Sequence, residues 1–165
     1  MRRELQLYCS YPMKNYWLMK TEKECYSIDD LERDGAISWD GVRNYQARNY
    51  MRDMKAGDMV LFYHSSSDPS GVAGIGRIAR AAHPDATALD PKEKHYDPKA
   101  TKDKPIWLVV DVEFARKFAE TIPLARIKID PALEGIMVAQ KGSRLSIMPV
   151  SEKHFKVIER IGTAA

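Results

Sequence analysis

The sequence predicts an α+β fold, a small mixed β-barrel that carries short helices on its periphery. Segments with the apolar pattern of strands outnumber and separate those with helical periodicity. The strands are spaced too irregularly for the repeated strand-helix-strand units of a parallel sheet. A chain of 165 residues, of which 44% are hydrophobic, is long enough to bury a core without metal or disulfide support, and no internal repeat divides it. We therefore expect a single domain.

Composition and charge argue against several classes of protein. No apolar run approaches the ~20 residues of a membrane helix, and polar residues interrupt the N-terminal stretch where a secretory signal would be apolar. Cys9 and Cys25 cannot form a disulfide framework or a four-ligand zinc site, and the histidines lack metal-ligand spacing. We expect no metal, no cofactor and a cytoplasmic location, or a nucleoid-associated or nuclear one if the ligand is DNA. The net charge of +3 permits nucleic-acid binding without demanding it.

The N-terminal part of the chain predicts an extension followed by a strand. Residues 1–14 lack periodicity, which indicates a flexible segment before a domain that spans residues 15–162. The run Tyr16–Met19 is apolar and aromatic, the profile of a buried strand, and Lys20 should end it.

Two helices should begin at serine caps. Ser27 is followed three residues later by Asp30, a capping arrangement that predicts a short helix ending at Gly35. Ser151 should cap the terminal helix, which has an apolar stripe and should end at Gly162.

The stretch Ile37–Met54 predicts a loop that leads into a short basic helix. Asn44 is the expected N-cap, and the turn at Gly57 closes the segment. Arg48 and Arg52, four residues apart, should project together into solvent. The apolar face of this helix is predicted from Ala47, Tyr50, Met51 and Met54, which fall at i, i+3, i+4 and i+7.

The rest of the chain reads mainly as strands. Gly74 and Gly76 lie on one strand face, where another backbone or a ligand could approach closely. Residues 83–105, rich in proline and charge, predict a long surface excursion, and Trp107 should point to the outer side of the strand that follows. Leu124–Ile129 could be a helical turn or a strand. The four further strands are predicted at Met59–His64, Val72–Ala81, Trp107–Phe114 and Leu145–Val150.

Six blocks of this sequence resemble those of a known family. They read YWLMKTEKECYSIDDL, SWDGVRNYQARNYMRDMKAGDMVLFYHSS, GVAGIGRIAR, YDP, WLVVDVEF and GSRLSIMPVSEKHF. Together they resemble the EVE domain over about residues 15–160, and SWxGVRNxxARN is the most specific of the patterns. The resemblance implies a PUA-like fold and kinship with the YTH domains, which hold a methylated adenine in an aromatic cage.

The resemblance also implies a function. EVE domains are thought to bind modified bases in DNA or RNA, cytosine derivatives among them, and are not known as enzymes. We therefore expect a non-catalytic and monomeric module that recognises a modified cytosine or adenine in an aromatic-lined pocket. Arg48 and Arg52 should contact phosphates. The positions expected to form the pocket are Trp17, Lys20, Ser38, Trp39, Gly41, Val42, Arg43, Asn44, Tyr63, His64 and Ser146.

Several of these residues also have a purely structural reading. Trp39 could pack inward from its loop, although stacking on a base would contribute ~1–3 kcal/mol, and the resemblance favours the ligand. Trp17 lies in an apolar strand, so core packing is favoured. Arg43 should face a ligand, whereas Lys20 could equally pair with Glu22.

Other readings of the pocket stay open. Asn44 is more safely a helix cap than a reader of a base edge, and Tyr63 and His64 at a strand end are weaker candidates. An enzyme acting on a nucleobase or nucleotide would use Asp40 or His64 as acid or base. A small-molecule or protein-interaction module would use the same pocket for another ligand.

Overall fold

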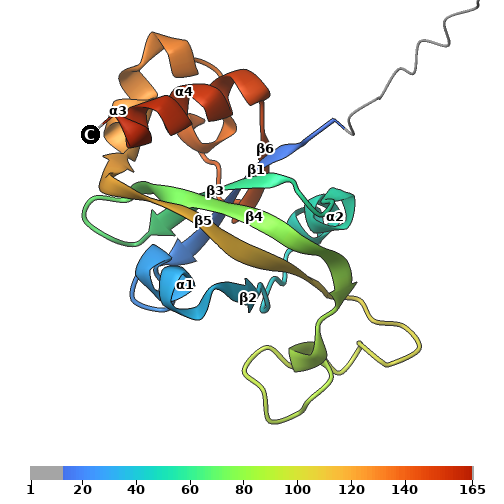
Figure 1. The fold of residues 1–165 in the computed structure, drawn as a ribbon. Helices are drawn as coiled ribbons and strands as arrows, with labels where there is room; N and C mark the ends of the chain where they lie inside the picture. The colour runs from blue at the N-terminus through green and yellow to red at the C-terminus, as the bar shows by residue number, and fades with distance from the viewer. Residues whose placement is uncertain (1–12, 165) are drawn as a thin grey trace, which may run out of the picture.

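A six-stranded mixed sheet forms the centre of the molecule (Figure 1). The computed structural model describes residues 13–164. The strands run in the spatial order β2-β5-β4-β3-β1-β6, with β1 and β3 parallel and the other neighbours antiparallel. Their bounds are β1 Tyr16–Glu22, β2 Ala36–Ser38, β3 Met59–Ser65, β4 Gly71–Pro84, β5 Leu108–Pro123 and β6 Ile147–Val150.

Within residues 13–164, four α-helices and three 3₁₀ turns surround the sheet. The predicted capping box is confirmed, because Ser27 Oγ accepts from the Asp30 N–H while the Asp30 carboxylate accepts from the Ser27 N–H. Asn44 and Ser151 are confirmed as N-caps. The bounds are α1 Ile28–Asp34, α2 Tyr45–Asp53, α3 Leu124–Ile129, α4 Glu152–Thr163, η1 Ala86–Ala88, η2 Pro131–Leu133 and η3 Met137–Ala139.

The α+β class is confirmed, but the sheet does not close into the expected barrel. Closure would require the edge strands β2 and β6 to pair, and they do not. The edge strand β2 has only three residues, and helix α2 packs against β4, β5 and β6. Buried side chains of α2, Ala47 and Met51, contribute to the core there, so the space between the two edges is filled by a helix instead of backbone pairing.

The sheet separates two apolar cores, because successive strand residues point to opposite faces. Leu18 and Leu61 belong to the core beneath α3 and α4, whereas Trp17 and Phe62 belong to the core covered by α1 and α2. Figure 1 shows α3 and α4 on one side of the sheet and α1 on the other. Trp39 joins the second core, so the candidate site lies on the α1 and α2 side.

The excursion predicted at residues 83–105 is an ordered lobe. Strand β4 continues to Pro84, and residues 85–107 then form a projection with its own small cluster of Ala88, Ala100 and Trp107. The expected outward position of Trp107 is wrong, since its ring is buried in that cluster and its indole N–H donates to Asp97 Oδ2 at 2.8 Å. Strand β5 begins only at Leu108.

Smaller differences concern the ends of elements. Lys20 does not end β1, which pairs with β3 as far as Glu22. Strand β5 extends to Pro123 because it pairs with the first half of β4, and α3 resolves the open reading of residues 124–129 as helix. Gly162 lies inside α4, against the ring of Phe118.

Some expectations concern parts of the chain that cannot be compared. The predicted extension falls mostly on residues 1–12, and Cys9 is among them, so both lie outside the described residues. The domain limits stay a prediction. Between residues 13 and 164, no helix has the length and apolar character needed to cross a membrane.

Candidate functional site

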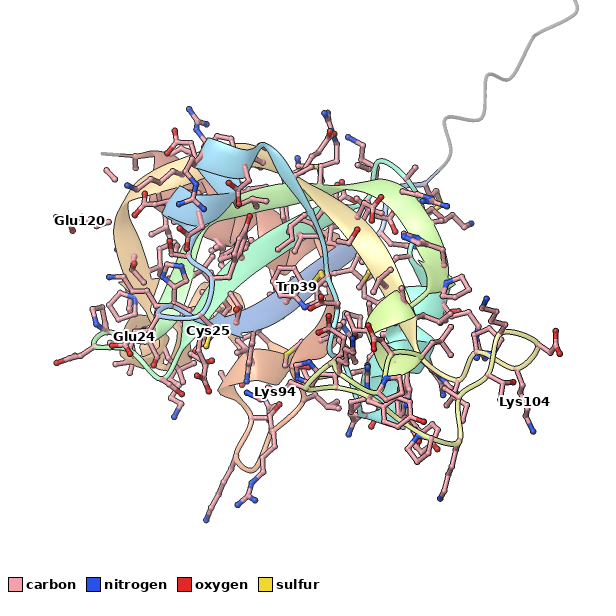
Figure 2. The ribbon with its side chains drawn as sticks, turned by 90° about the horizontal axis from the view of Figure 1, so that it is seen from below. Glu24, Cys25, Trp39, Lys94, Lys104 and Glu120 are labelled. Carbon is pink, nitrogen blue, oxygen red and sulfur yellow. The ribbon has the colours of Figure 1, made fainter. Side chains whose placement is uncertain are left out.

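Trp39 is held in the second core by the edge of the sheet. Its backbone N–H donates to Val110 O at 2.8 Å and so continues the pairing of β2 with β5 beyond Ser38. The ring meets Phe62 edge to face, with 5.6 Å between centroids, and the residue is 7% exposed. Figure 2 shows Trp39 near the middle of the face seen from below. The loop therefore buries most of the indole and leaves a small part of it open.

The Trp39 indole N–H has no hydrogen-bond partner among residues 13–164, although every fully buried side-chain polar atom described there has one. The N–H must therefore reach the surface. A tryptophan that is apolar on its inner side and has a free donor at the surface is suited to contact a planar, polar ligand.

Trp17 lies deeper in the same core. Its indole N–H donates to Asp58 Oδ2 at 2.9 Å, and its ring centroid is 6.0 Å from that of Tyr50. Asp58 is itself buried and also accepts from the backbone N–H groups of Asn15 and Lys55. Trp17 is core, as its strand position favoured, and it joins β1 to the turn before β3.

His64 lies on the same face of the sheet as Trp39 and Phe62. Its ring centroid is 5.6 Å from that of Phe62, and its Nε2 accepts a hydrogen bond from the N–H of Ile28 at the start of α1. Burial lowers the pKa of His64 below its ordinary value, with a smaller lowering effect from Lys23. The ring is therefore neutral, and its acceptor nitrogen is occupied.

Arg43 binds the protein itself. Its five N–H donors make five hydrogen bonds, two of them to His95 O at 2.6 and 3.0 Å and one to Asp85 Oδ2 at 2.9 Å. The other two reach Val42 O and Thr87 Oγ1. In the described conformation no N–H of this guanidinium is left for a ligand. Arg43 instead holds the lobe of residues 85–107 against the loop that follows Trp39.

Asp85 is the buried partner of this clamp. Its carboxylate also accepts from the N–H of Gly41 and from the N–H and hydroxyl of Thr87. Desolvation, the largest single effect, raises the pKa of Asp85, but the hydrogen bonds from Thr87, Arg43 and Gly41 together lower it below its ordinary value. The carboxylate is therefore ionised and fixed.

Gly41 brings the two segments into close contact. Its φ of +76° is unfavourable for residues with a side chain, and a Cβ built there would lie 2.8 Å from Cε1 of His95. The lobe thus packs directly on the backbone two residues after Trp39.

The start of α2 presents a mixed set of side chains. Asn44 Oδ1 caps the helix by accepting from the Ala47 N–H at 2.9 Å, and the residue is exposed, so its amide NH₂ remains available. Arg48 donates to Ile106 O at 3.1 Å and lies 4.9 Å above the ring of Tyr45. Arg52 is exposed and forms no ion pair with the described carboxylates.

Two predicted pocket residues, Lys20 and Tyr63, lie on the opposite face of the sheet. The Lys20 N–H donates to Ser146 O at 2.7 Å, and Lys20 Nζ lies 5.4 Å from the ring centroid of Tyr63, which belongs to the other core. Burial lowers the pKa of Lys20. The sheet therefore stands between this group and Trp39. Lys20 forms no ion pair with Glu22.

The remaining predicted residues lie beside Trp39. Ser38 is exposed, and its hydroxyl donates to Asp111 Oδ1 at 2.7 Å, while Val42 is buried in the same core as Trp39. The structure thus brings together Ser38, Trp39, Gly41 and Val42.

Sequence reasoning missed the lobe residues that complete this region. The rings of Tyr45 and Trp107 lie 4.9 Å apart, Arg43 lies 5.4 Å from the Trp107 ring and Arg48 lies 4.9 Å from the Tyr45 ring. These four groups form a cluster between α2 and the lobe. Asp97, in the YDP block, accepts a hydrogen bond from Trp107, and that block was the one feature of the sequence that pointed to the lobe. No sequence pattern pointed to Asp85, the acid partner of Arg43.

A large groove lies elsewhere. It has a volume of about 1020 Å³ between the end of β5, α3 and α4, and Arg126, Arg160 and Ile161 are among its lining residues. None of the predicted site residues lines it.

The mixed sheet with helices on both faces places the chain in the PUA-like class, in agreement with its structural neighbours. Within that class the chain belongs to the EVE domain family, whose model matches residues 15–161. It is 39% identical to human thymocyte nuclear protein 1 over 168 residues, which cover 91% of this chain and 75% of the human protein.

Solved structures agree with this assignment. A crystal structure of a Pseudomonas putida protein is 51% identical with a TM-score of 0.86, over 88% of this chain and 98% of the other. Human THYN1 in complex with DNA containing 5-methylcytosine is 37% identical with a TM-score of 0.83, over 91% and 98%. The YTH domain of Zygosaccharomyces rouxii MRB1, at 11% identity and a TM-score of 0.53 over 92% and 88%, shares the fold alone.

Proposed function

We propose that this domain is a non-catalytic module that binds nucleic acid carrying a modified base, with modified cytosine as the first candidate. The observation that carries the proposal is the likeness, at 37% identity over 91% of the chain, to a human protein crystallised with DNA containing 5-methylcytosine. Homologues this similar usually keep the fold, but function depends on the site, so the argument also needs a site that suits a base.

Trp39 is the residue that we propose for contact with the base. Its indole has a free N–H at the surface, while Phe62 and Val110 hold the rest of the residue in place. Ser38, Gly41 and Val42, its neighbours in the loop, are the residues that would adjoin the base. A base flipped out of a duplex costs a few kcal/mol of unstacking, and contact with an aromatic side chain returns ~1–3 kcal/mol. We propose Arg48 and Arg52 for flanking phosphates, with Arg52 the less constrained of the two.

The geometry of the core argues against a catalytic role for His64. In the enzyme hypothesis Asp40 or His64 would act as acid or base, but the Nε2 of His64 already accepts the N–H of Ile28 inside the core. General base catalysis requires a free acceptor within hydrogen-bond reach of the substrate. Removing this nitrogen from Ile28 would also leave a buried N–H unpaired.

The test is a calorimetric titration with oligonucleotides that differ only in one 5-methylcytosine, for the wild type, Trp39→Ala and Trp39→Phe. An added methyl group in an apolar pocket is worth roughly 1–3 kcal/mol, so the methylated strand should bind about 10- to 200-fold more tightly. Trp39→Ala should abolish that preference and Trp39→Phe should reduce it. Trp17→Phe, in the same core but with an indole N–H that donates to the buried Asp58, should keep it.

Circular dichroism spectra establish that each variant is folded. Equal affinity of the wild type for the methylated and plain strands would overturn recognition of modified cytosine, and a repeat with N6-methyladenine would then test the other predicted base. Binding that hardly weakens with salt would instead favour a small-molecule or protein ligand, because phosphate contacts make affinity fall steeply with salt.

A further inference from the structure

The backbone of Lys94 is held in place by its neighbour in the lobe. The carbonyl oxygen of His95 accepts two hydrogen bonds from Arg43, and the His95 ring lies against the backbone of Gly41. Lys94 is therefore one residue away from a point that is fastened to the loop of Trp39. A turn closed by the bond from Tyr96 N–H to Glu93 O holds the backbone of Lys94 itself.

The side chain of Lys94 is exposed on the face that carries Trp39. Figure 2 shows Lys94, Cys25 and Trp39 on this face, with Lys104 at the far end of the lobe. The pKa of the Cys25 thiol is raised chiefly by its hydrogen bond to Glu22 and by desolvation, while the nearby Lys94 ammonium acts in the opposite direction. The ammonium of Lys94 is thus close to the turn that follows β1, on the face where Trp39 opens to solvent.

The lysines of the lobe are not paired with its acids. It contains five lysines and five acids between residues 85 and 107, so its sequence is neutral overall. The carboxylates of Asp85, Asp90 and Asp97 accept hydrogen bonds from within the domain. No lysine of the lobe forms an ion pair with any carboxylate in residues 13–164. The lysines therefore remain available to an anionic partner.

We propose that Lys94 binds the backbone phosphate of the nucleotide next to the base held at Trp39. The proposal rests on the proposed function. It adds a phosphate contact at Lys94 to those proposed for Arg48 and Arg52. A lysine is a flexible point charge that binds phosphate without a fixed geometry, and such contacts position the strand without reading its sequence. The clamp by Arg43 holds the backbone next to Lys94 against the loop of Trp39 in the absence of ligand.

The experiment measures the affinity of the wild type, Lys94→Gln and Lys94→Arg for 5-methylcytosine and plain oligonucleotides at several salt concentrations. Lys94→Gln should weaken binding of both strands by the same factor and leave their ratio unchanged. The slope of log K against log salt should become shallower by about 0.7 for a single strand or 0.9 for a duplex, one phosphate's share. Lys94→Arg should keep the wild-type slope. Lys104→Gln, in the same lobe but at its far end, is the matched control and should behave as the wild type.

Each other outcome counts against a stated part of the proposal. An unchanged salt slope in Lys94→Gln, with the wild type still preferring the modified strand, overturns the phosphate contact alone. If Lys94→Gln loses the preference for the modified strand, Lys94 contacts the base, and the proposed phosphate contact is overturned as well. An equal loss in Lys104→Gln shows only diffuse attraction to the lobe. If the wild type binds neither strand, the proposed function and the Lys94 contact both fall.

Discussion

Replacing Arg43 by methionine should open the lobe of residues 85–107. The substitution removes five hydrogen bonds and leaves the carboxylate of Asp85, whose side chain is 1% exposed, without its cation. Breaking one partner out of a buried ion pair typically costs about 3–5 kcal/mol. Because Asp85 keeps its bonds from Gly41 and Thr87, we expect the lower end of that range, about 3 kcal/mol or roughly a hundredfold in the opening equilibrium.

Amide hydrogen exchange measures this opening directly. The reporters are the N–H of Asp97, bonded to Ala88 O, and the N–H of Asp85, bonded to Trp107 O, both at 3.0 Å. Their exchange should accelerate about a hundredfold in Arg43→Met, while amides in the centre of the sheet change much less, since the lobe has its own small core. Arg43→Lys should also leave the lobe amides poorly protected, because the three N–H donors of an ammonium cannot replace the five of the guanidinium.

Arg77→Met is the matched control. Arg77 pairs with Glu113, but the two side chains are 51% and 33% exposed, and an exposed ion pair contributes only about 0–1 kcal/mol. If lobe amides exchange at wild-type rates in Arg43→Met, or if Arg77→Met has the same effect, the clamp does not hold the lobe and the reasoning is refuted. Arg43 would then be free for the ligand contact that the sequence suggested.

Three further predictions concern stability. Trp17→Phe removes the bond to the buried Asp58 carboxylate, so the free energy of unfolding measured in urea should fall by about 1.5–3 kcal/mol, and an unchanged value would remove Asp58 as an anchor of β1. Because burial lowers the pKa of His64 below 6.5, the unfolded chain takes up the proton first and stability should fall as the pH drops below about 6.5; His64→Gln should lack this step. The lowered pKa of Asp85 predicts a second loss of stability as the pH falls below about 3.8, because the stabilisation by its ionised carboxylate is complete above that pH. The measurement is a series of urea unfolding curves at different pH values. A free energy of unfolding that stays constant through both pH ranges would contradict the roles given to His64 and Asp85.

Local signals in the sequence predicted the helix starts well. The capping box at Ser27 and the caps at Asn44 and Ser151 join groups only three residues apart, so the pattern contains the whole interaction. Strands were found from their apolar runs, but their ends were not. The extension of β5 to Pro123 depends on pairing with Gly71, which is far away in the chain.

The role of Arg43 could not be predicted because its partners are remote. Asp85 and His95 lie 42 and 52 residues along the chain, and nothing in the local sequence distinguishes a guanidinium aimed at a ligand from one aimed at a lobe. The same limit applies to Lys20 and Tyr63. Their place on the far face of the sheet from Trp39 follows from strand register, which only the paired sheet defines.

The sequence by itself determined the fold class, the family and the loop that carries Trp39, because these depend on periodicity and on contiguous motifs. Only the tertiary structure decided that the sheet stays open, that Arg43 closes a clamp and that Lys94 lies on the face of Trp39. Each of these results from contacts between segments tens of residues apart, and packing and burial select such contacts only when the whole chain is folded.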